Sequence, residues 1–238
     1  MTAPVLQVAG VCRRLAAGGS AFTIVIDRLE LAPGTRLAIV GPSGSGKSTM
    51  LALLGLALRP DPGGGTLCVD GTDALPLWRS GRTDALAALR AGSLGFVPQT
   101  GALLPFLSLW ENILLPQRIV NRPDPAFALR LAERLGIADL LQRRPAAVSV
   151  GQRQRAAIAR ALAHRPTLLL ADEPTAAVHP AQADAVLALL SAAAAQNGTA
   201  LVITTHDPDR AAAAGYVMAR CEPHPSENVT CFRWPEAA

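Results

Sequence analysis

The 238-residue sequence predicts an α/β fold built around a mostly parallel sheet. Three observations point to this fold class. Short runs that are apolar on both faces recur at residues 37–40, 167–171 and 200–204, which is typical of buried parallel strands. Longer stretches with a helical pattern separate these runs, as the crossovers between parallel strands require. Half of the residues are hydrophobic and only 17% are charged, which excludes a disordered chain.

The N-terminal part follows a different pattern. Short apolar runs at residues 5–8, 22–26 and 67–69 lie among glycine and proline residues that favour turns. Consecutive strands joined by turns pair antiparallel, so we predict an antiparallel β subdomain at one edge of the sheet.

Helices interrupt the alternation in the middle of the chain. Between residues 98 and 149, prolines bound short helices that we predict at 109–115 and 126–135. The tail after Gly215 contains further prolines and is expected to be irregular.

This organisation predicts one domain over residues 1–238. The core of this domain would comprise residues 1–97 and 150–238. Residues 98–149 would form a helical subdomain inserted into that core.

The composition argues against several classes of protein. The 22 basic residues give a net charge of only +4 and form no long run, so we expect no nucleic-acid partner. No apolar run approaches the roughly 18 residues that a membrane helix needs, so we expect a soluble chain. The four cysteines lack a C-x-x-C pair, which is typical of reduced thiols and not of a zinc site. Among the basic residues, 21 are arginine and one, Lys47, is lysine.

The single lysine lies in a phosphate-binding motif. Residues 41–48 match G-x-x-x-x-G-K-S between a predicted strand and an apolar helix predicted at 51–58. The glycines allow successive N–H groups to face one point, and the helix N-terminus adds partial positive charge. We expect Lys47 to reach the outer phosphates, where the planar fork of arginine does not fit, and Ser48 to ligate Mg²⁺. The motif predicts a P-loop NTPase core. Its expected nucleotide-binding residues are Gly41, Pro42, Ser43, Gly44, Ser45, Gly46, Lys47, Ser48 and Thr49.

Two adjacent carboxylates follow the buried run at 168–171. Side chains alternate along a strand, so Asp172 and Glu173 can take different roles. We expect Asp172 to hold Mg²⁺ through its water shell and Glu173 to orient or deprotonate the attacking water. Gln99 and His206 follow two other apolar runs, and ligands of open α/β sheets bind where such strand ends meet.

Ser149 and Gln152 open a predicted helix that runs to about residue 163. Serine followed three residues later by glutamine is a capping box, which is a sufficient local explanation. The alternative is that this helix N-terminus offers its N–H groups to the γ-phosphate of a nucleotide on a second molecule. The pattern by itself leaves both interpretations open.

Together these segments resemble the ATP-binding cassette (ABC) ATPases over nearly the whole chain. The matching elements, in the order of the family, are the Walker A loop at 41–48, the glutamine loop at Gln99, the signature at 148–155, Walker B at 168–172, the catalytic Glu173 and the switch histidine His206. The resemblance implies a head-to-tail dimer that sandwiches two ATP molecules. Each ATP would be held by the Walker loops of one subunit and the signature helix of the other.

The resemblance also assigns roles to individual residues and implies partners. The implied catalytic residues are Glu173, His206 and Lys47. The implied metal ligands are Ser48, Gln99 and Asp172. The implied nucleotide contacts outside the Walker A loop are Gln99, Ser149, Gly151 and Gln152. The implied partners are a second ABC ATPase subunit, in a homo- or heterodimer, and membrane-spanning transporter subunits. Such a chain would lie in the cytoplasm, peripheral on the inner face of the cell membrane.

One further segment narrows the function. Residues 103–116 are similar to a stretch of the ABC ATPases that serve lipoprotein release, macrolide export and related glycolipid export. The similarity favours an ATPase that powers an exporter or a lipoprotein- or lipid-extruding system. Two alternatives remain: an importer subunit, which shares every catalytic motif, and a soluble ABC ATPase that acts on nucleic acid or ribosomes. The last class typically carries two cassettes or long insertions, whereas this chain has one cassette.

The sequence departs from the family pattern at three positions. Leu15 stands where an aromatic residue usually stacks on adenine, Val150 where the signature usually has glycine, and His179 where aspartate is expected. Val150 and His179 belong to elements that serve the nucleotide of the opposite subunit. We hypothesise that this subunit hydrolyses ATP with its own Walker loops but supports the site of its partner less well.

Overall fold

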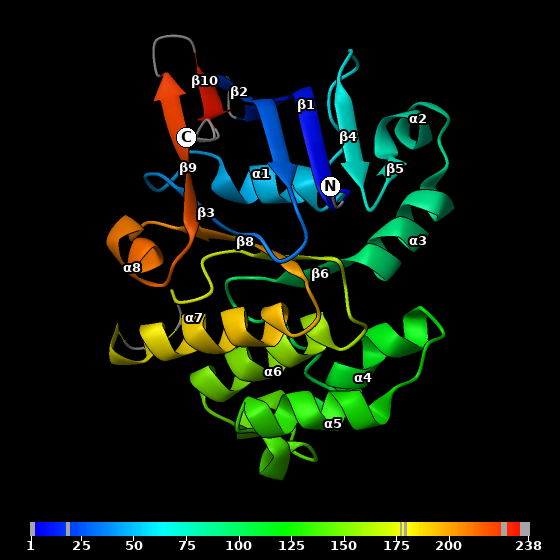
Figure 1. Cartoon of the computed structure of the whole chain (residues 1–238), viewed down its shortest axis with the longest axis vertical. Coiled ribbons are helices and arrows are strands. Elements are labelled where there is room, and N and C mark those ends of the chain that lie inside the picture. The colour runs from blue at the N-terminus through cyan, green and yellow to red at the C-terminus, as the bar shows by residue number, and fades with distance from the viewer. Residues whose placement is uncertain (1–2, 18–19, 177, 179, 225–227, 234–238) are drawn as a thin grey trace.

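The computed structural model describes residues 3–17, 20–176, 178, 180–224 and 228–233. In this part of the chain, one ten-stranded mixed sheet runs through the molecule in the order β5-β4-β1-β2-β10-β9-β3-β8-β7-β6 (Figure 1). Its strands are β1 (Leu6–Ala17), β2 (Ser20–Leu31), β3 (Arg36–Val40), β4 (Thr66–Val69), β5 (Thr72–Asp73), β6 (Leu94–Val97), β7 (Leu168–Ala171), β8 (Ala200–Thr205), β9 (Val217–His224) and β10 (Val229–Arg233). The helices are α1 (Lys47–Leu54), α2 (Ala74–Arg79), α3 (Thr83–Ser93), α4 (Leu109–Ile119), α5 (Pro125–Arg134), α6 (Val150–Leu162), α7 (Pro180–Ala195) and α8 (Pro208–Ala213), with the short 3-10 helices η1 (Ala138–Leu140) and η2 (Pro145–Ala147).

The parallel half of the sheet comprises β6, β7, β8, β3 and β9, which pair in that order. Every residue of β7 and β8 is buried, because α6 and α7 lie on one face of the sheet and α1 on the other (Figure 1). The strands predicted at 37–40, 167–171 and 200–204 are confirmed to within one residue at each end.

Alternation along β3 divides the hydrophobic core into two clusters. Ala38 belongs to the cluster that contains α6, α7 and the helices below them. Leu37 and Ile39 point the other way and pack with α1 and the N-terminal strands. The loop that follows β3 is therefore anchored between two packed layers.

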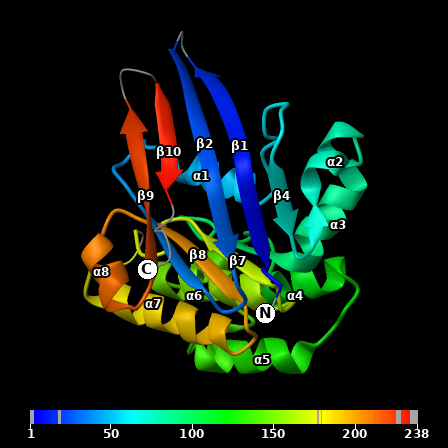
Figure 2. The same ribbon diagram turned by 45° about the horizontal axis from the view of Figure 1, so that its top comes forward.

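The N-terminal strands form the predicted antiparallel region at one edge. β1 pairs antiparallel with β2 from Leu6 opposite Leu31 to Ala17 opposite Ser20, and β4 pairs antiparallel with the other side of β1. Both long strands extend well beyond the apolar runs that predicted them, and in Figure 2 they project past the rest of the sheet.

The prediction of an irregular tail after Gly215 is wrong within the described residues. β9 and β10 continue the sheet: β9 pairs parallel with β3, and β10 lies between β9 and β2. Thr230 and Phe232 alternate inward with exposures of 0% and 1%, a period-2 pattern masked by the neighbouring prolines. Pro223 lies opposite Thr230 in the β9–β10 ladder, beyond Arg220, the last residue of β9 that pairs with β3.

The helices predicted at 109–115 and 126–135 are confirmed as α4 and α5, although α4 extends to Ile119. Their buried residues share one core cluster with α6, so the three helices pack together. The short helices α2 and α3 were not predicted from the sequence. In the part of the chain that the structure describes, no helix is both long and apolar enough to span a membrane.

Candidate nucleotide-binding and hydrolysis site

The phosphate loop joins the carboxyl end of β3 to the N-terminus of α1. This helix begins at Lys47 and ends at Leu54, so the prediction of 51–58 starts and stops four residues too late. Gly46 caps the helix with φ of 93° and Gly44 has φ of 76°, conformations that strain any residue with a Cβ atom. The first turn of α1 presents N–H groups that have no helical partner, which makes it an anion site.

Lys47 is almost fully buried in this loop, with 5% of its surface exposed. Its Nζ donates to the carbonyl oxygens of Gly41 at 2.9 Å and Pro42 at 2.8 Å. The loop wraps tightly around a compact ammonium, and the larger planar guanidinium has no equivalent fit. This geometry explains why the only lysine of the chain stands at this position.

Asp172 and Glu173 diverge where β7 leaves the sheet. The N–H of Asp172 still pairs with the Val97 carbonyl of β6 at 2.9 Å. Glu173 then adopts φ of 42°, and its N–H donates to Thr204 Oγ1 at 2.8 Å instead of continuing the ladder. The same hydroxyl donates to Asp172 Oδ1 at 2.7 Å. The sharp turn, and not the strand alternation on which the sequence prediction was based, gives the two neighbouring carboxylates different surroundings.

The carboxylate of Glu173 lies between two cationic or ionisable groups. Lys47 Nζ is 3.8 Å from Glu173 Oε1, and His206 Nδ1 is 3.8 Å from Oε2. These three side chains come from the loop after β3, the end of β7 and the end of β8, which are distant in sequence. The Glu173 side chain is 23% exposed, so water can reach a carboxylate that is positioned to accept a proton.

The oxygen atoms of Ser48 and Asp172 are suited to Mg²⁺. A hydroxyl at the exposed start of α1 and a half-buried carboxylate are hard donors of the kind that this ion prefers. Protein sites for Mg²⁺ usually supply one or two such ligands, while phosphates and water supply the rest. Gln99, the third predicted ligand, is exposed after β6, and no hydrogen bond in the described part of the chain joins it to the other two.

The signature residues form the local cap that the sequence predicted. Ser149 Oγ accepts from the Gln152 N–H at 3.3 Å, and Gln152 Oε1 accepts from the Ser149 N–H at 2.9 Å. Val150 follows with 45% exposure, and Gly151 is half-buried. Among described residues, no hydrogen bond or ion pair connects this helix start with the phosphate loop of the same chain. His179, the third departure from the family pattern, lies outside the described residues.

Sequence reasoning missed three side chains around the candidate site. One is Thr204, and another is Phe22, whose ring atoms would lie 3.0 Å from a Cβ added to Gly46. Phe22 pairs with Leu15 across β1 and β2, a relation that only the strand register reveals. A hydroxyl residue at the end of an apolar run was the available signal for Thr204.

Cys221 of β9 is the third. The Sγ–H of Cys221 donates to the Ser45 carbonyl at 3.1 Å. The Cys221 Cβ lies so close to Gly41 that a Cβ added to this glycine would be only 2.8 Å away from it. Burial raises the pKa of the Cys221 thiol, so the group stays protonated and supports the loop by packing.

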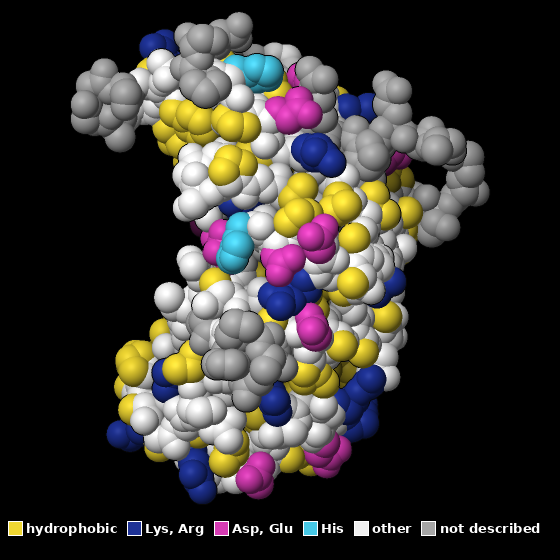
Figure 3. All heavy atoms as spheres, turned by 90° about the vertical axis from the view of Figure 1, so that its left-hand side faces the viewer, with side chains coloured by type: hydrophobic (Ala, Val, Ile, Leu, Met, Phe, Trp, Pro, Cys, Tyr) yellow, Lys and Arg dark blue, Asp and Glu magenta, His cyan; other side chains and the backbone are white. Residues whose placement is uncertain are grey.

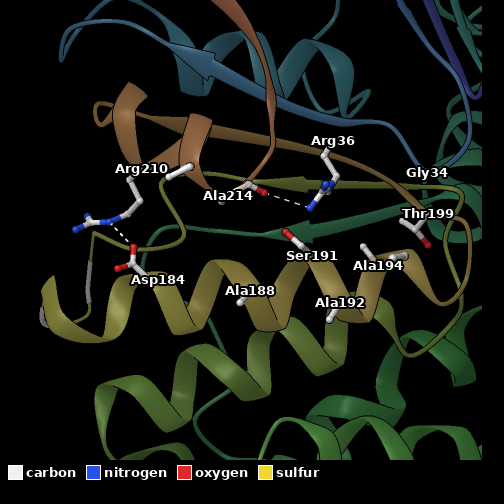
Figure 4. Close-up of a pocket in the computed structure, with 12 residues that line it drawn as sticks. Gly34, Arg36, Asp184, Ala188, Ser191, Ala192, Ala194, Thr199, Arg210 and Ala214 are labelled. Atoms are coloured by element: carbon white, nitrogen blue, oxygen red, sulfur yellow. Dashed lines mark hydrogen bonds and ion pairs between the residues drawn. The ribbon is translucent and has the colours of Figure 1, made fainter.

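Two cavities lie at opposite ends of the parallel strands. One of about 570 Å³ adjoins the phosphate loop and is lined by Gly41, Pro42, His206 and Cys221 among others. The other, of about 740 Å³, lies between α7, α8 and the start of β3, where Arg36 donates to Ala214 and Arg210 pairs with Asp184 (Figure 4). Because it includes the amino ends of β3 and β8, the larger cavity is separate from the phosphate loop at the carboxyl ends.

Figure 3 shows the face of the molecule that lies on the left in Figure 1, where α8 and β9 are found. Acidic, basic and histidine side chains gather near the middle of this face, at a hollow in its outline.

Comparison with known proteins places this geometry in a family. Residues 27–176 match the family model described as ABC transporter. The chain belongs to the ABC transporter family. It is 40% identical to the lipoprotein-releasing system ATP-binding protein LolD 2 of Caulobacter vibrioides, over 94% of this chain and 97% of that protein. It is 41% identical to the macrolide export ATP-binding/permease protein MacB of Sodalis glossinidius, over 87% of this chain and 31% of that longer protein.

The fold of this ABC protein agrees with solved structures. The dimeric ATP-binding cassette MJ0796, in a post-hydrolysis state bound to ADP and Pi, has a TM-score of 0.79 and 27% identity over 98% of this chain and 100% of that one. A putative metal-chelate type ABC transporter has a TM-score of 0.71 and 29% identity over 91% of this chain and 79% of that one. This ABC chain is therefore an ATPase subunit of a transporter, with the predicted P-loop fold.

Proposed function

We propose that the chain is the ATPase of an exporter or of a lipoprotein- or lipid-extruding system, and that it works through ATP-dependent head-to-tail dimerisation. The observation that carries the hydrolytic part is the position of Glu173, whose carboxylate oxygens lie 3.8 Å from Lys47 Nζ and 3.8 Å from His206 Nδ1. In this position Glu173 can act as a base for a water molecule that attacks the terminal phosphate, with Lys47 on one side to bind that phosphate and His206 on the other.

In this mechanism the first turn of α1 binds the phosphates through its free N–H groups. Lys47 leaves the carbonyls of Gly41 and Pro42 and reaches the outer phosphates. Glu173 orients the attacking water and takes its proton, while His206 donates to the γ-phosphate. Ser48 and Asp172 would hold Mg²⁺, with Gln99 as a further ligand, and the bound ion would neutralise charge on the phosphates.

The second half of each site would come from a second ABC ATPase subunit. The capped start of α6, with Ser149 and Gly151 exposed or half-buried, is free to approach a nucleotide on that subunit. Closure of the dimer would then require ATP in both sites. The same arrangement is supported by the dimeric state of the similar cassette.

Export is favoured over import by the relatives. LolD 2 and MacB, at 40% and 41% identity, are a lipoprotein-releasing and a macrolide-export protein. The partners would be membrane-spanning subunits, with the chain on the cytoplasmic face of the membrane. An importer uses the same catalytic residues, so the assignment depends on the identity of those subunits.

The Glu173→Gln variant tests the hydrolytic assignment. We expect it to bind ATP, to lose hydrolysis and to accumulate as a dimer, because the nucleotide remains but the base is neutral. Size-exclusion chromatography with light scattering and a phosphate-release assay measure both effects. Lys47→Ala is the control, since it should lose ATP binding and stay monomeric. Hydrolysis at the wild-type rate in Glu173→Gln would overturn the assignment.

The same variant tests the transport partner. Tagged Glu173→Gln chain, isolated from native membranes in ATP, should retain its membrane subunits because the closed dimer persists. Subunits with four membrane helices and a large extracytoplasmic domain would support export. Subunits of a solute importer would contradict it.

A further inference from the structure

Thr204 and Thr205 form the polar end of an otherwise apolar strand. The three preceding residues of β8, Leu201, Val202 and Ile203, are fully buried and hydrophobic, and Thr204 itself is 0% exposed. Burying a hydroxyl here is unfavourable unless its hydrogen-bonding capacity is used, and valine would fill the same space without that cost. The presence of threonine therefore requires an explanation from its contacts.

Both contacts of this hydroxyl involve the acidic pair at the end of β7. Oγ1 donates to Asp172 Oδ1 at 2.7 Å and accepts from the Glu173 N–H at 2.8 Å. One atom thus touches the carboxylate assigned to Mg²⁺ and the backbone of the residue assigned as base. Its donor capacity and one acceptor position are both in use.

The Glu173 contact occurs at a turn of strained backbone. Glu173 has φ of 42°, a left-handed conformation that a residue with a side chain rarely adopts. Its N–H has left the ladder that Asp172 still makes with Val97, and Thr204 is its hydrogen-bond partner. Without the hydroxyl, this half-buried turn would lose a hydrogen bond that supports its direction, and the direction of the turn determines where the Glu173 carboxylate points.

The Asp172 contact is of the kind that tunes metal sites. A carboxylate that ligates a metal is usually held by a hydrogen bond from a second residue, which sets its orientation. Removing such a partner typically costs 10- to 100-fold in metal affinity or activity. Donation to one oxygen of Asp172 restrains rotation of the carboxylate, so the orientation is set before the metal binds.

We propose that Thr204 is a positioning residue for this site, whose single hydroxyl couples the orientation of the Asp172 carboxylate to the turn that aims Glu173. The proposal rests on the proposed function of the site. Thr204 does not touch nucleotide in this arrangement and acts only through the two acids. It links the Mg²⁺ requirement of nucleotide binding to the placement of the base.

The test compares Thr204→Val, which keeps the shape and removes the hydroxyl, with Thr204→Ser, which keeps the hydroxyl. The matched control is Thr199→Val, which removes another buried hydroxyl, bonded to the Pro166 carbonyl at 2.7 Å just before the other end of β8. The readout is equilibrium binding of a fluorescent ATP analogue, titrated with Mg²⁺ and repeated in EDTA. Thermal unfolding of each variant is recorded alongside.

We expect Thr204→Val to need about 10- to 100-fold more Mg²⁺ for half-maximal nucleotide binding. Binding in EDTA should not change, because no hydrogen bond or ion pair among the described residues joins Thr204 to the phosphate loop or to Lys47. Thr204→Ser and Thr199→Val should both keep the wild-type Mg²⁺ requirement, although Thr199→Val should melt earlier. If Thr204→Val does not fold, Thr204→Cys replaces it, and its weaker S–H donor should give a several-fold increase.

A Mg²⁺ requirement in Thr204→Val, or in its Cys substitute, equal to that of Thr199→Val would overturn the proposal and leave Thr204 a structural hydroxyl. Loss of the wild-type requirement in Thr204→Ser would overturn it as well. A different failure is distinguishable: if the wild-type chain binds nucleotide without any Mg²⁺ dependence, the proposed function itself is contradicted.

Discussion

Leu15 and Phe22 face each other across β1 and β2, and Phe22 carries the aromatic ring. The ring lies next to Gly46, which caps α1, the helix whose N-terminus we propose binds the phosphates. At the residue scale, we therefore expect the Phe22 ring, on the strand next to Leu15, to take the place of the aromatic platform that is missing at Leu15.

Substituting Phe22 tests this replacement. We expect Phe22→Leu to weaken ATP binding by about 1–3 kcal/mol, or roughly 5- to 150-fold in Kd, because a stacking surface is lost. Leu15→Tyr should instead tighten binding by adding a second ring. Isothermal titration with ATP and with inorganic triphosphate separates the base from the phosphates. An unchanged Kd for ATP in Phe22→Leu would contradict the assignment.

At the scale of secondary-structure elements, two helices begin with the same motif, a capping box. Ser108 with Glu111 caps α4, and Ser149 with Gln152 caps α6, each through reciprocal side-chain and backbone hydrogen bonds. The α4 box lies far along the chain from the Walker residues. The α6 box belongs to the signature. Only its serine, Ser149, is therefore proposed to have a second role, at the nucleotide of the partner subunit.

The pair of boxes allows a matched test. Ser108→Ala and Ser149→Ala should each lower the free energy of unfolding by about 1 kcal/mol, because each loses an N-cap. Only Ser149→Ala should also reduce ATP hydrolysis, through its contact with the nucleotide of the partner subunit. Denaturant unfolding and steady-state ATPase assays measure the two effects. Equal ATPase rates in the two variants would contradict a role of Ser149 at the nucleotide and leave it only as a helix cap.

At the scale of the whole molecule, the proposed dimer makes each site depend on two chains. The equipment for a chain's own nucleotide, Lys47, Glu173 and His206, is brought together within one molecule. Val150, which is 45% exposed at the start of α6, and His179 are departures in elements that would serve the other chain. A side chain at position 150 limits how closely the helix start approaches a phosphate.

We therefore expect Val150→Gly and His179→Asp, singly and together, to raise the steady-state ATPase rate of the purified chain. The gain should be several-fold in a homodimer, where both sites contain the departures. Titrating each variant with wild-type chain shows whether the effect acts in trans. If neither substitution raises the ATPase rate, and the wild-type rate is already typical of the family, the hypothesis of an impaired partner site is wrong.

The sequence alone determined the parts of this protein that are local. The phosphate loop could be read because its nine residues are consecutive and its glycines and lysine act through their own backbone. The buried strands of the parallel sheet were predicted for the same reason, since an apolar run records burial on both faces. The helix caps at Ser108 and Ser149 are also local, and the one at Ser149 was predicted.

Tertiary structure decided what depends on strand pairing. Glu173 meets Lys47 and His206 only because β7, β8 and β3 are neighbours in the sheet. The same pairing brings the Thr204 hydroxyl to the acidic pair and Phe22 to the phosphate loop, contacts that no spacing along the chain encodes. The tail strands were missed because prolines suggest loops, whereas the ladder tolerates a proline wherever its missing N–H faces no partner.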